Sequence, residues 1–236
     1  MNSSLILNDT APVTLEKQSS LRTPVSKIAV SIIRDENPIG NTVVLNPHAV
    51  KALVDNEVKV FIQRGFSANS SYSDMDYANE GAEFEDEFVN LASMSKLLLK
   101  LTPFTREQMD MLHDSQIILS TQHPTLITAS DIQSINDKKI SALAFNLIKD
   151  STGYSFTDKI LTETLSPIAT NIALSNFILP MLLDILLNPN FRFALQRTPA
   201  LMQSVYCYGG YLCNREMAEL LNLPCRDIVS LCWDLN

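Results

Sequence analysis

Short apolar runs separated by polar turns fill the first two thirds of the chain. They alternate with segments whose apolar residues recur at three- and four-residue steps. Such runs are typical of buried strands, and the periodic segments are typical of helices. Five strands are expected, at residues 27–33, 57–63, 95–101, 115–122 and 139–148. The alternation, with its short links, predicts an α/β fold: a flavodoxin-like parallel sheet of about five strands with helices on both faces.

Local signals indicate where several helices of this part begin and end. Asn46 is expected to cap a helix that has Pro47 at its first position, directly after a short strand at residues 43–45. Ser73 begins a further helix in the manner of a capping box, and Gly81 ends it. These ends follow from local chemistry alone, because each depends on residues close together in the chain.

After Tyr154 the alternation stops, and a helical pattern without glycine runs from Ser155 to Leu187. Pro167 and Pro180 interrupt the pattern, which predicts one kinked helix or two or three shorter helices end to end. Polar residues spread through the segment argue against a membrane crossing. Residues 188–208 are expected to continue as helix.

The change of pattern indicates the domain organisation. Residues 1–26, rich in Ser, Thr, Asn and Pro, are interpreted as an N-terminal arm. Residues 27–236 are expected to form a single domain, in which 27–154 are the α/β core and 155–236 are a closing helical segment. The last expected helix of that segment spans residues 213–223.

Composition narrows the function classes. The chain of 236 residues has a net charge of −8 and no long basic run, which argues against nucleic-acid binding. Residues 83–88, rich in acidic side chains, are interpreted as a solvated helix face. No pair of the four cysteines has metal or redox spacing, so reduced, mostly buried thiols and no metal site are expected. The N-terminus lacks the pattern of a signal peptide, so the chain is expected to be cytoplasmic.

Several segments resemble one family in order and spacing. Residues 27–47, 57–84 and 97–124 resemble the opening strands, glycine loop and following strand–helix–strand of the alanine dehydrogenase and proton-translocating transhydrogenase family. Residues 172–185 and 208–223 resemble its closing segment, in the form of the alanine dehydrogenase branch. The resemblance runs from residue 27 to about residue 230. It implies the substrate domain of an NAD-dependent enzyme.

The same resemblance indicates a missing domain. In the family, a Rossmann domain that binds NAD is inserted before the closing helices. Here residues 159–165 resemble the outgoing helix and residues 169–176 the returning one, and they are nearly adjacent. The chain has six glycines, none of which form a G-x-G pair, so it has no dinucleotide-binding turn. No cofactor is therefore expected.

The resemblance also assigns site positions. The arginine that binds the substrate carboxylate in the family falls on Thr42, and the catalytic lysine falls on Thr102. Lys100, two residues before Thr102 on the same strand face, is a candidate to replace that lysine in substrate binding. The acid/base histidine falls on His123 and the asparagine at the edge of the site on Asn176, both retained. The catalytic aspartate belongs to the missing domain.

Each candidate also has a structural explanation. His123 precedes a proline and fits a loop position, and Lys100 fits a strand-end lysine. Asn176 fits a cap or a buried hydrogen-bonding residue of a helix, while Thr42 and Thr102 fit structural positions.

Three functions are compatible with this pattern. The first is a degenerate alanine dehydrogenase-like module that is not an enzyme on its own and serves binding or assembly. The second is a subunit that completes an oxidoreductase with a separate NAD-binding chain. The third is a sensor of a small 2-oxo acid or amino acid. A homodimer is expected, since an apolar helical surface needs covering. No nucleic-acid or membrane partner is expected.

Overall fold

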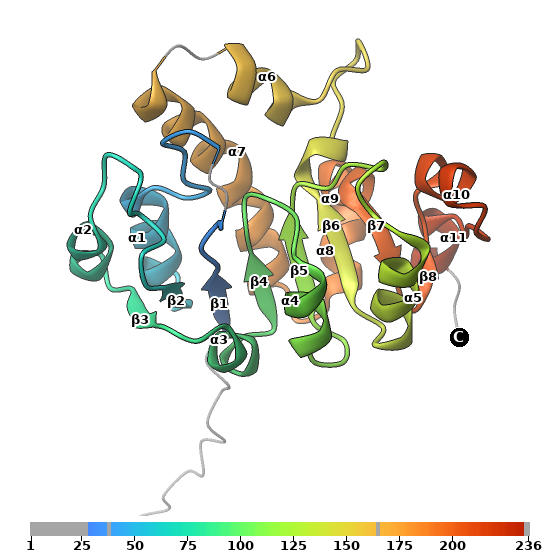
Figure 1. Cartoon of the computed structure of the whole chain (residues 1–236), viewed down its shortest axis with the longest axis horizontal. Helices are drawn as coiled ribbons and strands as arrows, with labels where there is room; N and C mark the ends of the chain where they lie inside the picture. The colour runs from blue at the N-terminus through green and yellow to red at the C-terminus, as the bar shows by residue number, and fades with distance from the viewer. Residues whose placement is uncertain (1–27, 37–38, 164–165, 234–236) are drawn as a thin grey trace, which may run out of the picture.

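The computed structural model describes residues 28–36, 39–163 and 166–233 and shows a mostly parallel sheet between two layers of helices (Figure 1). The strands are β1 (Ala29–Ile32), β2 (Lys59–Gln63), β3 (Glu83–Glu85), β4 (Leu97–Leu99), β5 (Ile117–Ser120), β6 (Ser141–Ala144), β7 (Val205–Tyr208) and β8 (Tyr211–Leu212). Their order is β3-β2-β1-β4-β5-β6-β7-β8, and β7 and β8 extend the parallel part by antiparallel pairs. The expected α/β fold is confirmed.

The five expected strands correspond to β1, β2, β4, β5 and β6, although β6 ends at Ala144 and residues 145–147, which were expected to continue it, form a 3₁₀ turn. Taken in chain order they lie second, first, third, fourth, fifth, which is the flavodoxin-like arrangement. In β4, Leu97 and Leu99 pack into the core on one face and Leu98 into the core on the other. Because both faces are covered, apolar residues occupy adjacent positions of these strands and not only alternate ones, and the few polar residues among them, such as Ser31, are mostly buried as well.

The interpretation of the acidic residues 83–88 is wrong. Glu83–Glu85 form β3, an edge strand parallel to β2, and α3 (Phe88–Met94) begins only after it. An edge strand tolerates charged side chains because one of its sides is open to solvent. Phe84 supplies the one apolar contact of β3 with the core. The short strand expected at residues 43–45 is also absent, although these residues are buried.

The expected helix over residues 188–208 ends at Ser204. It is divided into α8 (Phe191–Arg197) and α9 (Pro199–Ser204), and the next residues form β7 instead of helix. The pairing of β7 with β6 decides this, because the two segments are far apart in sequence and only the fold brings them together. The closing segment is therefore not purely helical, since it adds two strands to the sheet. The expected arm, residues 1–26, lies outside the described residues.

The remaining helical elements complete the two layers, and those that begin after Asn46 and Ser73 have the predicted caps. The remaining elements are α1 (Pro47–Asp55), α2 (Asp74–Asn79), α4 (Arg106–Met111), α5 (Ala129–Asp137), the 3₁₀ turn η1 (Phe145–Leu147), α6 (Phe156–Glu163), α7 (Pro167–Leu187), α10 (Arg215–Leu221) and α11 (Ile228–Trp233). Asn46 accepts a hydrogen bond from Ala49 N at 2.9 Å, and Ser73 forms the expected capping box. Gly81 follows α2 with φ of +95°, the left-handed conformation that ends helices. The helix α11 was not expected.

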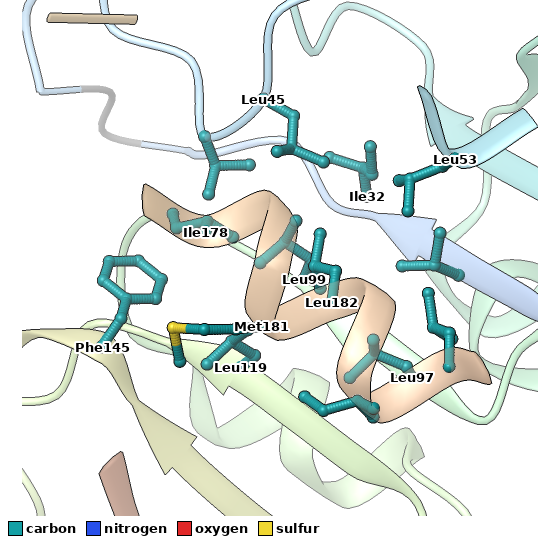
Figure 2. Packing of buried hydrophobic residues seen from close by; sticks show 14 of the residues in the cluster. Ile32, Leu45, Leu53, Leu97, Leu99, Leu119, Phe145, Ile178, Met181 and Leu182 are labelled. Carbon is teal, nitrogen blue, oxygen red and sulfur yellow. The ribbon is translucent and has the colours of Figure 1, made fainter. Parts of the chain in front are cut away.

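The long helix α7 lies against the middle of the sheet. Figure 2 shows Ile178, Met181 and Leu182 over the side chains of Leu97, Leu99 and Leu119. The helix packs here because its inner face is apolar. Burying one leucine of this kind stabilises the fold by about 1.5–3 kcal/mol. The expectation of more than one helix is confirmed, because α6 ends at Glu163 and α7 begins at Pro167 and continues through Pro180. The expected end-to-end arrangement is wrong, since α6 packs alongside α7 and brings the rings of Phe156 and Phe177 to 4.7 Å.

By length and composition α7 could cross a membrane, contrary to what its polar residues suggested, since its mean hydropathy reaches 1.6. Half of that window is buried within the structure, where it packs on the sheet. A core helix has these same properties.

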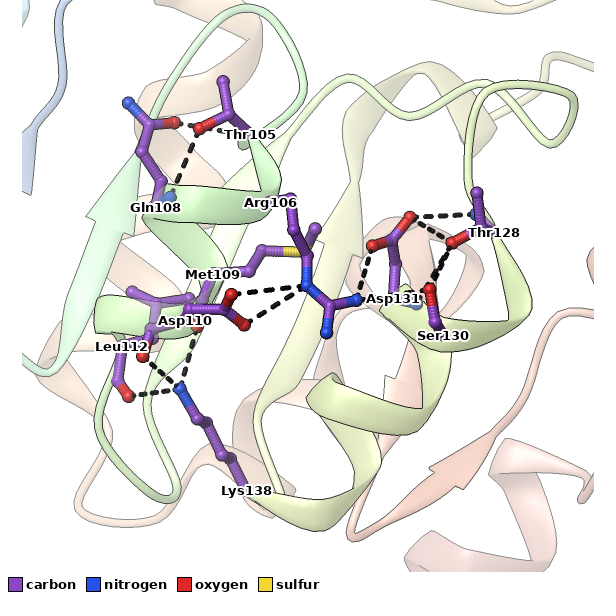
Figure 3. A network of polar contacts seen from close by, with 10 residues as sticks. All are labelled: Thr105, Arg106, Gln108, Met109, Asp110, Leu112, Thr128, Ser130, Asp131 and Lys138. Carbon is purple, nitrogen blue, oxygen red and sulfur yellow. Dashed lines mark hydrogen bonds and ion pairs between the residues drawn. The ribbon is translucent and has the colours of Figure 1, made fainter.

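On the opposite face, α4 and α5 are joined by polar contacts (Figure 3). Arg106 pairs with Asp131 at 3.0 Å and with Asp110 at 3.3 Å. Lys138 donates to the carbonyls of Met109, Asp110 and Leu112, at 2.9, 2.7 and 3.0 Å. These carbonyls belong to the end of α4, where the regular intrahelical donors end, although Met109 O also accepts from Leu112 N at 3.3 Å. Lys138 therefore serves as the cap of that helix.

Candidate functional site

The sheet reverses its order at β1, and this fixes where a crevice forms. From β1 the chain passes to β2 and β3 on one side, whereas β4 lies on the other side of β1. The loops that follow β1 and β4 therefore part in opposite directions at the carboxyl edge of the sheet. Open α/β sheets bind their ligands at such a switch point.

A cavity of about 390 Å³ lies at the same carboxyl edge, beside the switch point and on the β2 side of it, and its described lining includes no residue of the loop after β4. It is formed by the loop after β1, the segment before α1 and the loop after β2. Its polar and charged lining residues are Arg34, Asp35, Glu36, Thr42, Asn69 and Ser70. Val43, Phe66 and Ala68 supply apolar surface. The wall thus carries both signs of charge beside a small apolar area.

Arg34 is exposed and lies across the loop after β2. Its backbone N–H donates to Gln63 Oε1 at 3.1 Å, and its Nη1 donates to the carbonyl of Arg64 at 3.3 Å. Gly65 has φ of +78°, and a Cβ added there would lie 3.3 Å from Arg34 Nη1. Glycine therefore serves two purposes at this position, because it adopts the left-handed turn and leaves room for the guanidinium.

Asp35 and Thr102 join the two sides of the switch point. The Asp35 carboxylate accepts from Thr102 N at 2.8 Å and from Thr102 Oγ1 at 2.6 Å. Burial raises the pKa of Asp35, although the Thr102 bonds and the positive charge of Lys100 oppose the change. Thr102 was expected as the position of the family's lysine, and here its hydroxyl is engaged in holding Asp35.

Lys100 is buried and lies outside the set of residues that line the cavity. Its Nζ donates to Gln108 Oε1 at 3.1 Å and to the carbonyl of Pro103 at 3.3 Å. Burial lowers the pKa of Lys100, and the negative charges of Asp35 and Glu36 oppose the change. Its substrate-binding role stays a prediction, while its observed contacts are with Pro103 in the loop before α4 and with Gln108 in the first turn of that helix.

Thr42 lines the cavity, as a site residue should, and α7 holds its segment in place. Asn171 Oδ1 accepts from Val43 N at 2.9 Å, and Ser175 Oγ accepts from Asn46 N at 2.8 Å. Asn171 and Ser175 are not among the site residues expected from the sequence. They could have been predicted from the sequence, because they are polar residues four positions apart on the inner face of an apolar helix.

The structure places His123 and Asn176 away from this cavity. His123 lies exposed in the loop after β5, and its carbonyl accepts from Leu126 N at 3.0 Å. Asn176 is exposed on α7, one residue after the buried Ser175. Neither lines the cavity that Thr42 lines. Their proposed roles stay predictions.

The helix starts around the sheet offer little to a dinucleotide. Side-chain oxygens of Asn46, Ser73, Thr105 and Thr128 cap α1, α2, α4 and α5 and occupy N–H groups of their first turns. The N-cap of α3 is Glu87, whose carboxylate opposes a phosphate. A pyrophosphate needs free amides after a glycine-rich turn, so these residues do not fit NAD.

Metal and thiol chemistry have no evident place either. Within the ranges that the structure describes, no group of three or more His, Cys, Asp or Glu is arranged to hold a metal ion. The four cysteines are free, and Cys207 and Cys232 are buried. Burial raises the pKa of both thiols, which disfavours the reactive thiolate.

Comparisons with known proteins agree with the fold. The family model described as "Alanine dehydrogenase/PNT, N-terminal domain" matches residues 32–159, more than half of the chain. A solved structure of an L-alanine dehydrogenase aligns with TM-score 0.69 at 10% identity, covering 83% of this chain and 99% of that one. A transhydrogenase from Sinorhizobium meliloti aligns with TM-score 0.47 at 17% identity, covering 52% of this chain and 36% of that one. No curated protein matches.

Proposed function

Because the chain belongs to the alanine dehydrogenase/PNT N-terminal domain family, we propose that it is a binding module derived from a substrate domain and that it does not transfer hydride on its own. The proposed ligand is a small carboxylate-bearing molecule. The site is the cavity at the carboxyl edge of β1 and β2.

The contact between Thr102 and Asp35 carries this proposal. The position that the family resemblance assigns to a catalytic lysine holds a threonine, and both of its donors are directed at one carboxylate oxygen. No ammonium group therefore projects from this position to polarise a carbonyl. The nearest lysine, Lys100, is bound to Gln108 and Pro103 instead.

The connection between α6 and α7 supports the second half of the proposal. In the family a cofactor domain is inserted at this place, whereas here α6 ends at Glu163 and α7 begins at Pro167. Hydride transfer is the work of the cofactor, and the protein must first hold it. The side-chain caps on the helices around the sheet also support this half of the proposal, because they leave few free amides for a dinucleotide.

Thermal unfolding with added ligands tests the proposal. Pyruvate or L-alanine should raise the melting temperature of the purified protein, because a ligand at 100 times its Kd stabilises the folded state by about 2.7 kcal/mol. NADH should neither shift the transition nor be oxidised in the presence of pyruvate and ammonium. Oxidation of NADH by the purified chain would refute the non-catalytic part.

A matched pair of variants assigns the effect to the cavity. Ala68 lines the cavity and is exposed, so Ala68→Trp should obstruct it and abolish the shift. Ala78 is exposed on α2 and lies outside the lining, so Ala78→Trp should leave the shift unchanged. Equal shifts in the two variants would place binding elsewhere.

A second candidate is a subunit that completes an oxidoreductase with a separate NAD-binding chain. The observation that favours it is the exposed apolar surface where α6 meets α7: Phe156, Ile168 and Ile172 are 43%, 51% and 44% exposed. Patches of this kind are typical of interaction surfaces. This candidate predicts pyruvate-dependent NADH oxidation only after a chain bearing a Rossmann domain is added, and its loss in Ile172→Glu.

A further inference from the structure

We propose that Arg34 anchors the carboxylate of a zwitterionic α-amino acid in the cavity and that Asp35 and Glu36 face its ammonium group. The inference rests on the proposed function, since it specifies the ligand of the same cavity. Arg34 lies outside the positions that the family resemblance assigns to the substrate.

The guanidinium of Arg34 has donors to spare. Its Nη1 donates to the carbonyl of Arg64, and none of the ion pairs within the described part of the chain involves Arg34. A guanidinium has five N–H donors in a planar fork that matches a carboxylate. An exposed arginine on a cavity wall, held at one nitrogen, is therefore prepared for a bidentate contact.

The position of Arg34 is built into the fold. Its backbone is fixed to β2 through Gln63, and Gly65 gives its side chain room to cross the neighbouring loop. The contact needs β1 beside β2, because Arg34 follows one strand and Gly65 follows the other. Thr42, where the resemblance places the family's arginine, lines the same cavity. The cavity thus has an arginine at position 34, whereas position 42, where the family's arginine would lie, has the neutral Thr42.

The negative charges of the same wall select the ligand. Asp35 is fixed by Thr102, and Glu36 is exposed with no hydrogen bond or ion pair within the described residues. A 2-oxo acid would gain the Arg34 contact and then meet two carboxylates without compensation. An α-amino acid presents an ammonium group next to its carboxylate and satisfies both signs of charge. Val43 and Phe66 offer apolar surface to its side chain.

Titration calorimetry on the full chain tests this with matched probes. The probes are L-alanine and L-valine, the corresponding 2-oxo acids, and the corresponding amino acid amides. The 2-oxo acids lack the ammonium group and the amides lack the carboxylate. The amino acids should bind at least about tenfold more tightly than either analogue. Loss of one charge-assisted contact should weaken binding roughly 10- to 100-fold.

Three variants separate the contributions. Arg34→Gln should weaken the binding of the amino acids roughly 10- to 100-fold. Glu36→Gln should weaken the binding of the amino acids, whereas the 2-oxo acids should bind with the same or higher affinity. The control Arg64→Gln removes the same charge from the neighbouring loop after β2, on a side chain that pairs with Asp86 and lies outside the cavity lining, and it should have no effect.

The possible failures are distinguishable. If the amino acids bind wild type and Arg34→Gln equally, Arg34 is not the anchor, while the binding function stands. If the 2-oxo acids bind more tightly than the amino acids, the zwitterion is refuted. If none of the probes binds, the proposed function fails and this inference fails with it.

Discussion

Replacing Asn171 by alanine should destabilise the protein and loosen the wall of the cavity. Asn171 is fully buried on α7, and its amide accepts from Val43 N at 2.9 Å and donates to the carbonyl of Asn41 at 3.3 Å. Asn41 is exposed, so water can replace its bond at little cost. Val43 is buried, and its N–H would lose its partner, which costs about 1–3 kcal/mol. With the cavity left by the side chain, we expect a loss of about 2–3 kcal/mol.

Urea unfolding followed by circular dichroism measures this loss as a lower midpoint at unchanged slope. The control is Asn176→Ala on the same helix. Asn176 is exposed and makes no side-chain hydrogen bond within the described residues, so its replacement should change stability by no more than about 0.5 kcal/mol. A result for Asn171→Ala within that range would refute the role assigned to the amide. The same variant should weaken any ligand of the cavity, because Val43 and Thr42 line it.

Three further perturbations test other parts of the structure. Lys138→Met removes three hydrogen bonds to the end of α4 and should lower the free energy of unfolding in urea by about 1–3 kcal/mol. The control Lys51→Met removes two surface ion pairs and should lower it by less than about 0.5 kcal/mol. Equal losses would contradict the capping role. Burial raises the pKa of Asp35, so the stability linked to this group is full below the pKa of the unfolded chain and is lost as pH rises through the folded pKa. From about pH 4 to about pH 7, wild type should therefore lose stability relative to Asp35→Asn, and parallel pH profiles would oppose this. Light scattering should find a dimer that Ile172→Glu converts to a monomer, since Ile172 is exposed on α7; a monomeric wild type would reject the dimer.

Local chemistry made much of the fold predictable. The five main strands are short, mainly apolar runs, and the start of α1 is set by Asn46 and Pro47 within four residues of chain. Burial on both faces of a parallel sheet needs such runs wherever the neighbours lie. The observed order of these five strands is the flavodoxin-like one that was expected from the alternation of strands and helices. These elements depend little on distant contacts.

The mistaken elements are those that depend on distant partners. Glu83–Glu85 form a strand only because β2 offers its free edge, and Val205–Tyr208 form one because β6 lies beside them. Neither segment has a periodicity that distinguishes strand from helix, so pairing decides the outcome. The acidic residues of Glu83–Glu85 suggested a solvated helix face, and the helical segments before Val205–Tyr208 suggested that helix continues there, so both suggestions were wrong.

For the candidate site, the family resemblance of the sequence assigned the substrate arginine to Thr42 and the catalytic lysine to Thr102, so both charges were expected to be absent from these positions. Only the tertiary structure joined Thr102 to Asp35, laid Arg34 across Gly65 and set Asn171 against Val43. Each of these contacts joins segments about 30 to 130 residues apart, and its existence depends on which strands and helices become neighbours. A residue type and a spacing can predict an element, whereas a site is made where elements meet.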